Sequence, residues 1–162
     1  MQLRKIMLIA MVFICCVGID QATKIVVRAE ISVGVSYSWL HDTVRLTHAE
    51  NSGAFLSLGG QLPESVRRTL FSTVALLVSL VALIAALLMR DISRNQVIGL
   101  TLISAGGFAN WIDRVTNDGH VTDFMNVGIG WLRTGIFNVA DMALMVGIGL
   151  FIFAAQKTPE NR

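Results

Sequence analysis

The stretch from residue 69 to residue 89 reads TLFSTVALLVSLVALIAALLM and contains no charged residue, glycine or proline. At ~1.5 Å rise per residue, an α-helix of this length extends about 31 Å, which matches the hydrocarbon core of a bilayer. Of the 162 residues in the chain, 54% are hydrophobic and 15% are charged. The mean hydropathy is +0.64. This composition indicates a membrane protein and excludes a soluble enzyme, a disordered tail and a disulfide-stapled secreted domain.

Four apolar stretches are candidate membrane spans, at residues 6–27, 69–89, 96–112 and 136–155. The loop at residues 29–68 mixes β-branched and aromatic residues with polar ones, a pattern typical of strands. We therefore predict an all-α membrane protein with four transmembrane helices and a small extramembrane β-sheet between the first and second helices. The sequence contains no internal repeat or low-complexity segment, so we expect residues 1–162 to form a single membrane-embedded domain.

The first apolar stretch has an alternative interpretation. A short basic lead followed by an apolar run, here ending at Asp20, also begins secretory signal peptides. However, no small-x-small cleavage site precedes Asp20, and apolar residues resume after Lys24. We therefore interpret residues 6–27 as the first span.

Four spans place both termini on one side of the membrane. Lys and Arg residues are divided evenly between the two sides. Those near the termini and in the turn at residues 90–95 are concentrated in short segments, which weigh most in the positive-inside rule. We therefore expect both termini in the cytoplasm. The net charge of only +2 and the lack of a Lys/Arg block argue against a nucleic-acid partner.

Carboxylates gather at one membrane boundary in this topology. Asp20 lies near the exit of the first span, Asp113 at the exit of the third, and Asp141 just inside the start of the fourth. Because successive spans run in opposite directions, these positions share one side of the membrane. The loop between the third and fourth spans adds Asp118 and Asp123. Acidic residues near the apolar layer are costly unless they are paired or hydrated, so this cluster predicts a functional site.

The sequence does not favour metal or cysteine chemistry. His41, His48 and His120 lie in predicted loops, away from the i, i+4 spacing of a helical zinc site, so we expect no metal or other cofactor. Cys15 and Cys16 lie in the middle of the first span. We expect them to act as small buried apolar side chains without a disulfide.

Serine and carboxylate mechanisms differ in the partners that they need. Ser52 precedes a glycine, but no predicted span contains a histidine, and Lys24 is the only buried lysine that would serve as its base. Two acids in a low-dielectric site share one proton and together activate water, without a separate nucleophile. Asp123 in HVTDF and Asp141 in FNVAD form the best-placed pair.

Other acids have structural interpretations. Asp20 and Lys24 lie at i, i+4 with the acid first, the favourable order for a helical ion pair. Asp113 is expected to form an interfacial ion pair with the adjacent Arg114. A small proton- or ion-conducting bundle would also contain clustered acids, but it predicts acids through the depth of the membrane. A non-catalytic assembly factor is a third alternative, and it would tolerate neutralisation of Asp141.

Five short motifs occur along the chain in one order. They are D-Q-x-x-K from Asp20, E-N-x-G-A-F from Glu50, G-x-x-x-N-x-x-D-R from Gly106, V-x-D-F from Val121 and F-N-x-A-D from Phe137. This combination resembles lipoprotein signal peptidase, also called signal peptidase II, over the whole chain. The resemblance implies a four-helix aspartic protease of the bacterial inner membrane that removes signal peptides from prolipoproteins, cutting before a diacylglyceryl-modified cysteine. Prolipoproteins and membrane lipids are the implied partners, and an oligomer is not required.

The resemblance also implies roles for individual residues. It assigns Asp123 and Asp141 as the catalytic pair of a site that opens toward the outer face of the membrane. The residues implied to bind substrate or support the site are Asn51, Gly106, Asn110, Arg114, Asn138, Ala140, Asp20, Lys24 and Asp113.

Several of these residues also have a purely physical interpretation. Gly106 permits either a close helix approach or room for a substrate backbone. Asn110 and Asn138 either orient the acids or simply join helices by hydrogen bonds. Arg114 either binds a substrate carbonyl or extends its guanidinium to the membrane interface.

Overall fold

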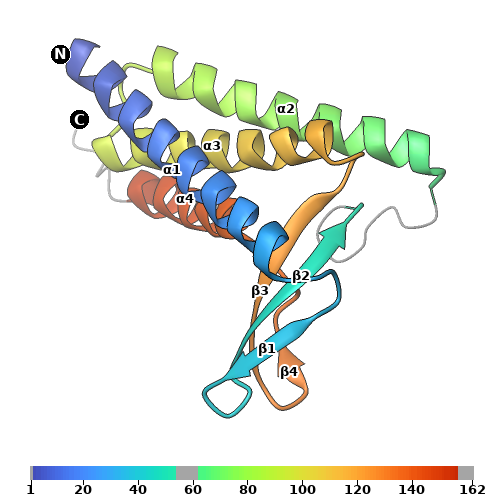
Figure 1. Ribbon diagram of the computed structural model, residues 1–162. Coiled ribbons are helices and arrows are strands. Elements are labelled where there is room, and N and C mark those ends of the chain that lie inside the picture. The colour runs from blue at the N-terminus through green and yellow to red at the C-terminus, as the bar shows by residue number, and fades with distance from the viewer. Residues whose placement is uncertain (1, 54–61, 157–162) are drawn as a thin grey trace.

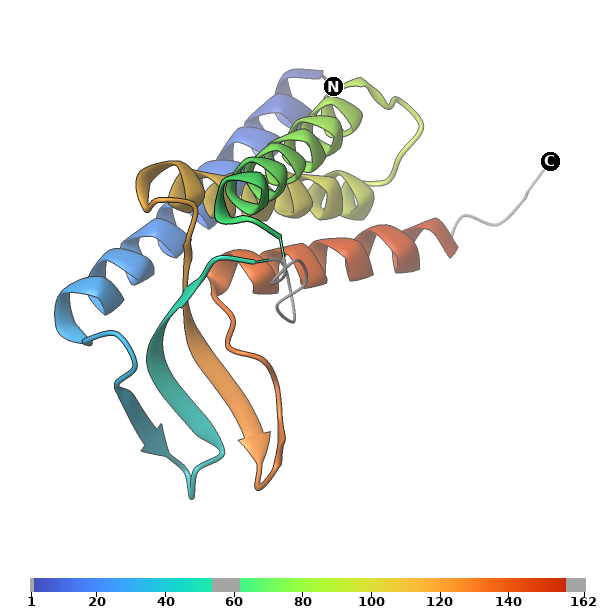
Figure 2. The same cartoon turned by 90° about the vertical axis from the view of Figure 1, so that its right-hand side faces the viewer.

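The computed structural model describes residues 2–53 and 62–156, which form four helices and a four-stranded sheet (Figure 1). The helices are α1 (Gln2–Glu30), α2 (Glu64–Leu88), α3 (Arg94–Thr116) and α4 (Val139–Gln156). The strands are β1 (Ser36–Trp39), β2 (Val44–Asn51), β3 (Val121–Ile129) and β4 (Leu132–Arg133). The helices form a bundle from which the sheet extends, and the N-terminus lies at the end of the bundle far from the sheet (Figure 2). Each apolar stretch predicted as a span overlaps one of these helices, although residues 136–138 precede α4 and Met89 follows α2.

The bundle has an apolar exterior and a partly polar interior. Met7 on α1, Val81 on α2 and Met145 on α4 are 63%, 66% and 71% exposed. Ser104 on α3 is fully buried, where its carbonyl accepts a hydrogen bond from the Ser79 hydroxyl at 2.7 Å. Large exposed apolar side chains around buried polar groups are typical of a protein surrounded by lipid.

Two of the described helices, α1 and α2, are long and apolar enough to cross a membrane. Helix α4 contains a shorter apolar segment, Val139–Ala154. Helix α3 carries charged residues near both ends and packs against the other three helices. It begins at a capping box, in which the Ser93 hydroxyl accepts from the Gln96 N–H and the Gln96 side chain accepts from the Ser93 N–H. Such reciprocal bonds satisfy donors that an uncapped first turn leaves free.

Helices α3 and α4 approach each other closely because small residues lie between them. A methyl group at Gly106 would lie 2.5 Å from the Ala140 carbonyl oxygen. Further along the same contact, a methyl group at Gly99 would lie 2.7 Å from the Gly147 carbonyl oxygen. Gly106 therefore lies at a close helix approach, where a larger side chain would push α4 away from α3.

The sheet is antiparallel, with strand order β1-β2-β3-β4. The β2–β3 register aligns Asn51 with Val121 and Ala49 with Asp123. Side chains two positions apart on paired strands lie on the same face, so this register brings Asn51 beside Asp123. The sheet thereby holds one predicted catalytic residue next to one predicted supporting residue.

The prediction that this sheet lies between the first and second helices was wrong for half of its strands. Strands β1 and β2 are there, but β3 and β4 come from the connection between α3 and α4. The segment VTDFMNVGI has the β-branched residues of a strand. Its interleaved Asp123 and Asn126 resemble loop residues, yet both are buried. Asp123 accepts from Asn51 on β2 and from Asn138 beside α4, whereas Asn126 bonds to Arg133 and Thr134 at β4.

Candidate active site

Asp123 and Asp141 line the same cavity, which has a volume of about 540 Å³ and lies where the sheet meets the bundle. Asp123 comes from β3 and Asp141 from the first turn of α4. Asn51, Asn110 and Arg114 line the same cavity. The fold thus brings both predicted catalytic acids and three of the predicted supporting residues into one place.

The Asp123 carboxylate is almost completely enclosed, with 3% exposure. One oxygen accepts from Asn51 Nδ2 at 2.9 Å, and the other accepts from Asn138 Nδ2 at 2.7 Å. Burial, together with the nearby charge of Asp141, raises the pKa of Asp123 to about 7. The two amide donors oppose this rise because they favour the ionised carboxylate. Asp123 is therefore able to exchange a proton near neutral pH.

Asp141 is held by the start of its own helix and by α3. Its Oδ2 accepts from the Asn138 backbone N–H at 3.2 Å, while Asn138 Oδ1 accepts from the Asp141 backbone N–H at 2.9 Å. This reciprocal arrangement is a capping box made by the F-N-x-A-D motif. The other carboxylate oxygen, Oδ1, accepts from Asn110 Nδ2 at 2.9 Å.

Asn138 is the bridge between the two acids. Besides capping α4, its Nδ2 donates to Asp123 and, at 3.1 Å, to Asn110 Oδ1. The Asn138 side chain is completely buried, and Asn110 is 7% exposed. These asparagines thus join α3 to α4 and also bind the two carboxylates directly, as the interpretation that they orient the acids requires.

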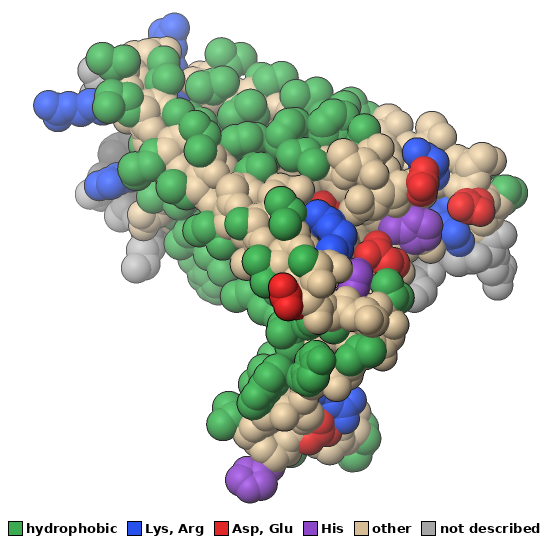
Figure 3. Space-filling model, viewed as in Figure 1, with side chains coloured by type: hydrophobic (Ala, Val, Ile, Leu, Met, Phe, Trp, Pro, Cys, Tyr) green, Lys and Arg blue, Asp and Glu red, His purple; other side chains and the backbone are tan. Residues whose placement is uncertain are grey.

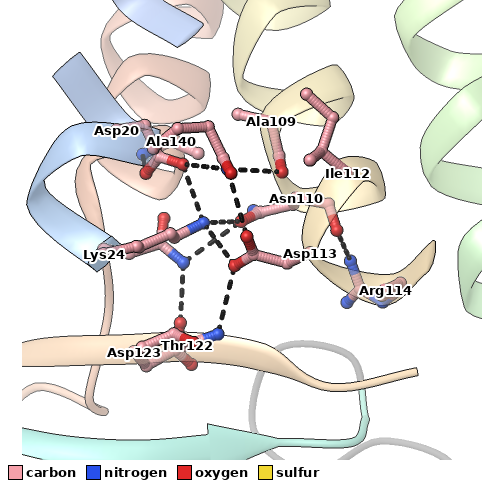
Figure 4. Close-up of polar contacts among 12 residues, drawn as sticks. Asp20, Lys24, Ala109, Asn110, Ile112, Asp113, Arg114, Thr122, Asp123 and Ala140 are labelled. Carbon is pink, nitrogen blue, oxygen red and sulfur yellow. Dashed lines mark hydrogen bonds and ion pairs between the residues drawn. The ribbon is translucent and has the colours of Figure 1, made fainter. Parts of the chain in front are cut away.

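A buried ion cluster lies directly behind the asparagines (Figure 4). Lys24 Nζ donates to Asp20 Oδ2 and Asp113 Oδ2, both at 2.8 Å, and to Asn110 Oδ1 at 3.0 Å. The Asp20, Lys24 and Asp113 side chains have no exposed surface. The predicted Asp20–Lys24 pair is present, and Lys24 connects it to α3.

The prediction that Asp113 pairs with Arg114 was wrong. Asp113 binds Lys24 from α1, and its Oδ1 lies 3.8 Å from Arg28 Nη1. Consecutive helical residues point in directions about 100° apart, so Asp113 and Arg114 face different neighbours. Gln21, the second residue of the D-Q-x-x-K motif, donates to Asp113 Oδ1 at 3.0 Å.

The ion cluster also binds the backbone beside each predicted catalytic residue. Asp20 Oδ1 accepts from the Ala140 N–H at 2.8 Å, one residue before Asp141. Asp113 Oδ2 accepts from the Thr122 N–H at 3.2 Å, one residue before Asp123. Sequence reasoning missed Thr122 because the bond to Asp113 is made by its backbone N–H, which every residue type except proline carries.

Arg114 is buried rather than extended toward the membrane interface, with 8% exposure. Its Nη1 donates to the Asn110 carbonyl at 3.1 Å and its Nη2 donates to the Gly53 carbonyl at 3.2 Å. These bonds connect α3 to the E-N-x-G-A-F segment at the cavity edge. The last residues of that motif, Ala54 and Phe55, lie outside the described residues.

Comparison with known proteins shows the family to which this arrangement belongs. A family model described as signal peptidase (SPase) II matches residues 12–157. The chain belongs to the signal peptidase II family. A lipoprotein signal peptidase of Streptococcus pneumoniae is 33% identical over 98% of this chain and 99% of its own length. A lipoprotein signal peptidase of Desulforapulum autotrophicum is 35% identical over 94% of each chain.

Solved structures agree with the sequence matches. A bacterial membrane enzyme determined by the in meso method at 2.3 Å resolution superposes with a TM-score of 0.80, at 26% identity, covering 95% of this chain and 93% of that one. A second, at 1.9 Å resolution, has a TM-score of 0.79 and 25% identity, covering 93% and 94%. Membership of the signal peptidase II family makes this chain a protease of lipoprotein processing, and its fold is the family fold.

Within this signal peptidase II fold, the other catalytic groups considered are poorly arranged. Ser52 lines the cavity, but all three N–H donors of the Lys24 ammonium are used by buried acceptors, which leaves no free base. His48 is buried between the Ile31 carbonyl and Glu50. Across residues 2–53 and 62–156, no three His, Cys, Asp or Glu side chains are grouped to hold a metal ion.

Proposed function

We propose that this signal peptidase II family member is an intramembrane aspartic endopeptidase that removes signal peptides from diacylglyceryl-modified prolipoproteins. Asp123 and Asp141 would be its catalytic pair. The observation that carries this proposal is that Asn138 binds both acids, which line one cavity. Two carboxylates in one poorly solvated site favour a state with a single shared proton.

In the proposed reaction, water enters between the two carboxylates and the scissile peptide carbonyl. The ionised carboxylate removes a proton from water as the water oxygen bonds to the carbonyl carbon, and the protonated carboxylate donates its proton to the carbonyl oxygen. The tetrahedral diol collapses when the carbon–nitrogen bond breaks. The carboxyl group that took the proton from water gives it to the leaving amine, and the other carboxylate takes one hydroxyl proton of the diol, which restores the pair. A pKa of Asp123 near 7 suits this exchange at neutral pH.

The supporting residues would hold the two carboxylates in position while this chemistry occurs. Asn51, Asn110 and Asn138 each donate to a carboxylate oxygen, so a misplaced acid would lose a hydrogen bond. Gly106 and Ala140 would set the distance between α3 and α4, and therefore the position of Asp141. Positioning of this kind contributes strongly to catalysis, because a displacement of about 1 Å costs roughly 10²-fold in rate.

The membrane placement rests on the apolar exterior of the bundle. We propose that all four helices span the bacterial inner membrane, with both termini in the cytoplasm and the active site at the outer face. At ~1.5 Å per residue, the 23-residue α3 and the 18-residue α4 extend about 35 Å and 27 Å, close to the thickness of the bilayer core. The acyl chains of a lipid-modified cysteine would then stay in the bilayer while the peptide reaches the cavity.

The alternative of a proton-conducting bundle is disfavoured by the position of the acids. Asp20, Asp113, Asp123 and Asp141 are joined in one network near the sheet. Among the described residues, the opposite half of the bundle contains no buried acidic or basic side chain. A proton relay needs ionisable side chains through the depth of the membrane.

The direct test is to incubate the protein, purified in detergent, with a diacylglyceryl prolipoprotein. We expect the substrate to be shortened by its signal peptide, while the same substrate without the diacylglyceryl group stays intact. Proton flux in liposomes without cleavage would support the conducting bundle.

A topology reporter that is active only outside the cytoplasm tests the proposed orientation. Fused after Asp42 or Asp118 it should function, and fused after Arg90 it should fail. The reverse pattern would contradict the proposed orientation.

A further inference from the structure

A second cavity lies at the opposite end of the bundle from the predicted catalytic acids. It has a volume of about 1010 Å³ and is lined by the start of α1, the end of α2, the following turn and the start of α3. From Arg4 at this cavity to Asp20 at the active site, α1 rises about 24 Å. The cavity is therefore separate from the site that cleaves substrate. In the proposed topology it faces the inner leaflet.

The rim of this cavity is strongly basic. Arg4, Lys5, Arg90 and Arg94 all line it. Asp91, the acidic residue of the same turn, is not part of the lining. Figure 3 shows that Lys and Arg side chains gather at this end of the molecule, beside the apolar surface of the helices. Four positive charges around one cavity favour an anionic ligand.

The basic side chains of the rim differ in whether they already bind other groups of the protein. Lys5 Nζ donates to the Met89 carbonyl at 2.7 Å and to the Leu87 carbonyl at 3.3 Å, so it caps the end of α2. This anchors its charge at the rim and leaves one ammonium donor for a ligand. Within the described residues, neither Arg90 nor Arg94 forms an ion pair with a carboxylate. A phosphate that binds these two exposed arginines would therefore displace no carboxylate of residues 2–53 or 62–156.

The walls of the cavity are apolar. Leu8, Leu87, Ile92 and Val97 line it beneath the basic rim. Leu88, also in the lining, is 72% exposed and extends the apolar wall onto the outer surface of the bundle. A ligand with a negatively charged head and apolar tails would satisfy both the rim and the walls.

We propose that this cavity, with its rim of Arg4, Lys5, Arg90 and Arg94, binds the phosphodiester headgroup of an anionic phospholipid. The acyl chains would lie along the apolar wall that continues onto the membrane-facing surface. The start of α3 adds to the attraction, because the N-terminal end of a helix carries partial positive charge. A bound lipid would join α1, α2 and α3 at the end of the bundle where the sheet makes no contact.

Lipid binding by the full-length protein in nonionic detergent tests this proposal. Native mass spectrometry would count bound dioleoylphosphatidylglycerol, which is anionic, and dioleoylphosphatidylcholine, which has the same acyl chains but no net charge. We expect the anionic lipid to bind more tightly and to raise the unfolding temperature more. Equal binding of the two lipids would overturn the proposal, because it would mean that only the apolar walls matter. Equal stabilisation by inorganic phosphate alone would also overturn it.

Matched variants distinguish lipid binding at this cavity from general attraction of anionic lipid to a positively charged protein. Arg90→Gln with Arg94→Gln should weaken phosphatidylglycerol binding about 30-fold, given the usual contribution of a basic residue near an anionic lipid. Arg45→Gln with Arg68→Gln removes the same charge from the sheet end and should leave binding within about twofold. All four arginines are at least partly exposed, so both double variants should fold. Equal loss of binding in the two double variants would overturn the proposal.

Discussion

Asn138 and Asp141 bind each other reciprocally, through Asn138 Oδ1 with the Asp141 N–H at 2.9 Å and Asp141 Oδ2 with the Asn138 N–H at 3.2 Å. The same pair of bonds starts α4 and orients a predicted catalytic carboxylate. Asn138 also donates from its side chain to Asp123 at 2.7 Å. The stability of one helix and the geometry of the proposed site therefore depend on a single amide.

Substitutions of Asn138 should separate these two roles. Asn138→Ser keeps a hydroxyl that can cap α4 but is too short to bind Asp123. We expect it to keep the helix cap, to lose about 1–3 kcal/mol of stability because buried acceptors lose their donor, and to lose at least about tenfold in cleavage rate. Asn138→Ala also removes the cap, which should cost about 1 kcal/mol of stability in addition.

The pH dependence of cleavage provides a second measurement on the same variant. The Asn138 amide lowers the pKa of Asp123, so its loss in Asn138→Ser should move the titration of Asp123 to higher pH. The pH profile of kcat/KM should shift in the same direction. An unchanged profile, with the rate reduced equally at every pH, would show that Asn138 supports only the helix.

The raised pKa of Asp123 predicts how stability depends on pH. Its pKa is about 7 in the folded protein and near the ordinary value of about 4 in the unfolded chain. Between these values the folded state holds a proton that the unfolded chain has released. The unfolding free energy should therefore fall by up to roughly 4 kcal/mol as the pH rises from about 4 to about 7, and this contribution should stay constant above pH 7.

Asp123→Asn removes this titration, so it tests whether Asp123 lowers the unfolding free energy as the pH rises. Replacing an acceptor oxygen by an amide adds a constant cost, because Asp123 accepts from Asn51 and Asn138. The difference in unfolding temperature, variant minus wild type, should nevertheless be more positive at pH 8 than at pH 5. A difference that is equal at both pH values would mean that Asp123 is not protonated on folding.

The buried ion cluster predicts strong non-additivity. Lys24→Met leaves Asp20 and Asp113 buried without their cation and should destabilise the protein by about 3–5 kcal/mol. Adding Asp113→Asn to Lys24→Met removes one of the two unpaired charges and should recover part of that loss. Thermal unfolding of both single variants and the double variant measures the coupling. Additive effects would contradict the cluster.

The close contact between α3 and α4 predicts opposite outcomes for two glycines. Gly106→Ala places a methyl group against the Ala140 carbonyl, so α4 should shift and carry Asp141 with it. We expect a loss of about 10²-fold in cleavage rate for a shift near 1 Å. Gly149→Ala is the matched control on α4, because a methyl group there meets nothing within 4 Å. It should retain activity and gain up to about 1 kcal/mol in stability.

The helices were predictable from sequence because each contains a long apolar run, and the proposed catalytic pair was predictable because Asp123 and Asp141 lie in short local motifs. Strand β3 was not, since its polar residues face buried partners that are distant in the chain. The Lys24–Asp113 ion pair could not be predicted from the sequence either. Adjacent Arg114 seemed the nearer partner, and only the packing of α1 on α3 brings Lys24 to Asp113.

The central claim is that Asp123 and Asp141 together perform acid–base catalysis. Its most direct measurement is the rate at which purified Asp123→Asn and Asp141→Asn cleave a diacylglyceryl prolipoprotein, at equal amounts of folded protein. Each variant should lose ~10²–10⁴-fold, whereas Ser52→Ala, in the same cavity, should stay within about twofold of wild type. Retention of more than about a tenth of the wild-type rate by either asparagine variant would contradict the account, as would loss of cleavage in Ser52→Ala.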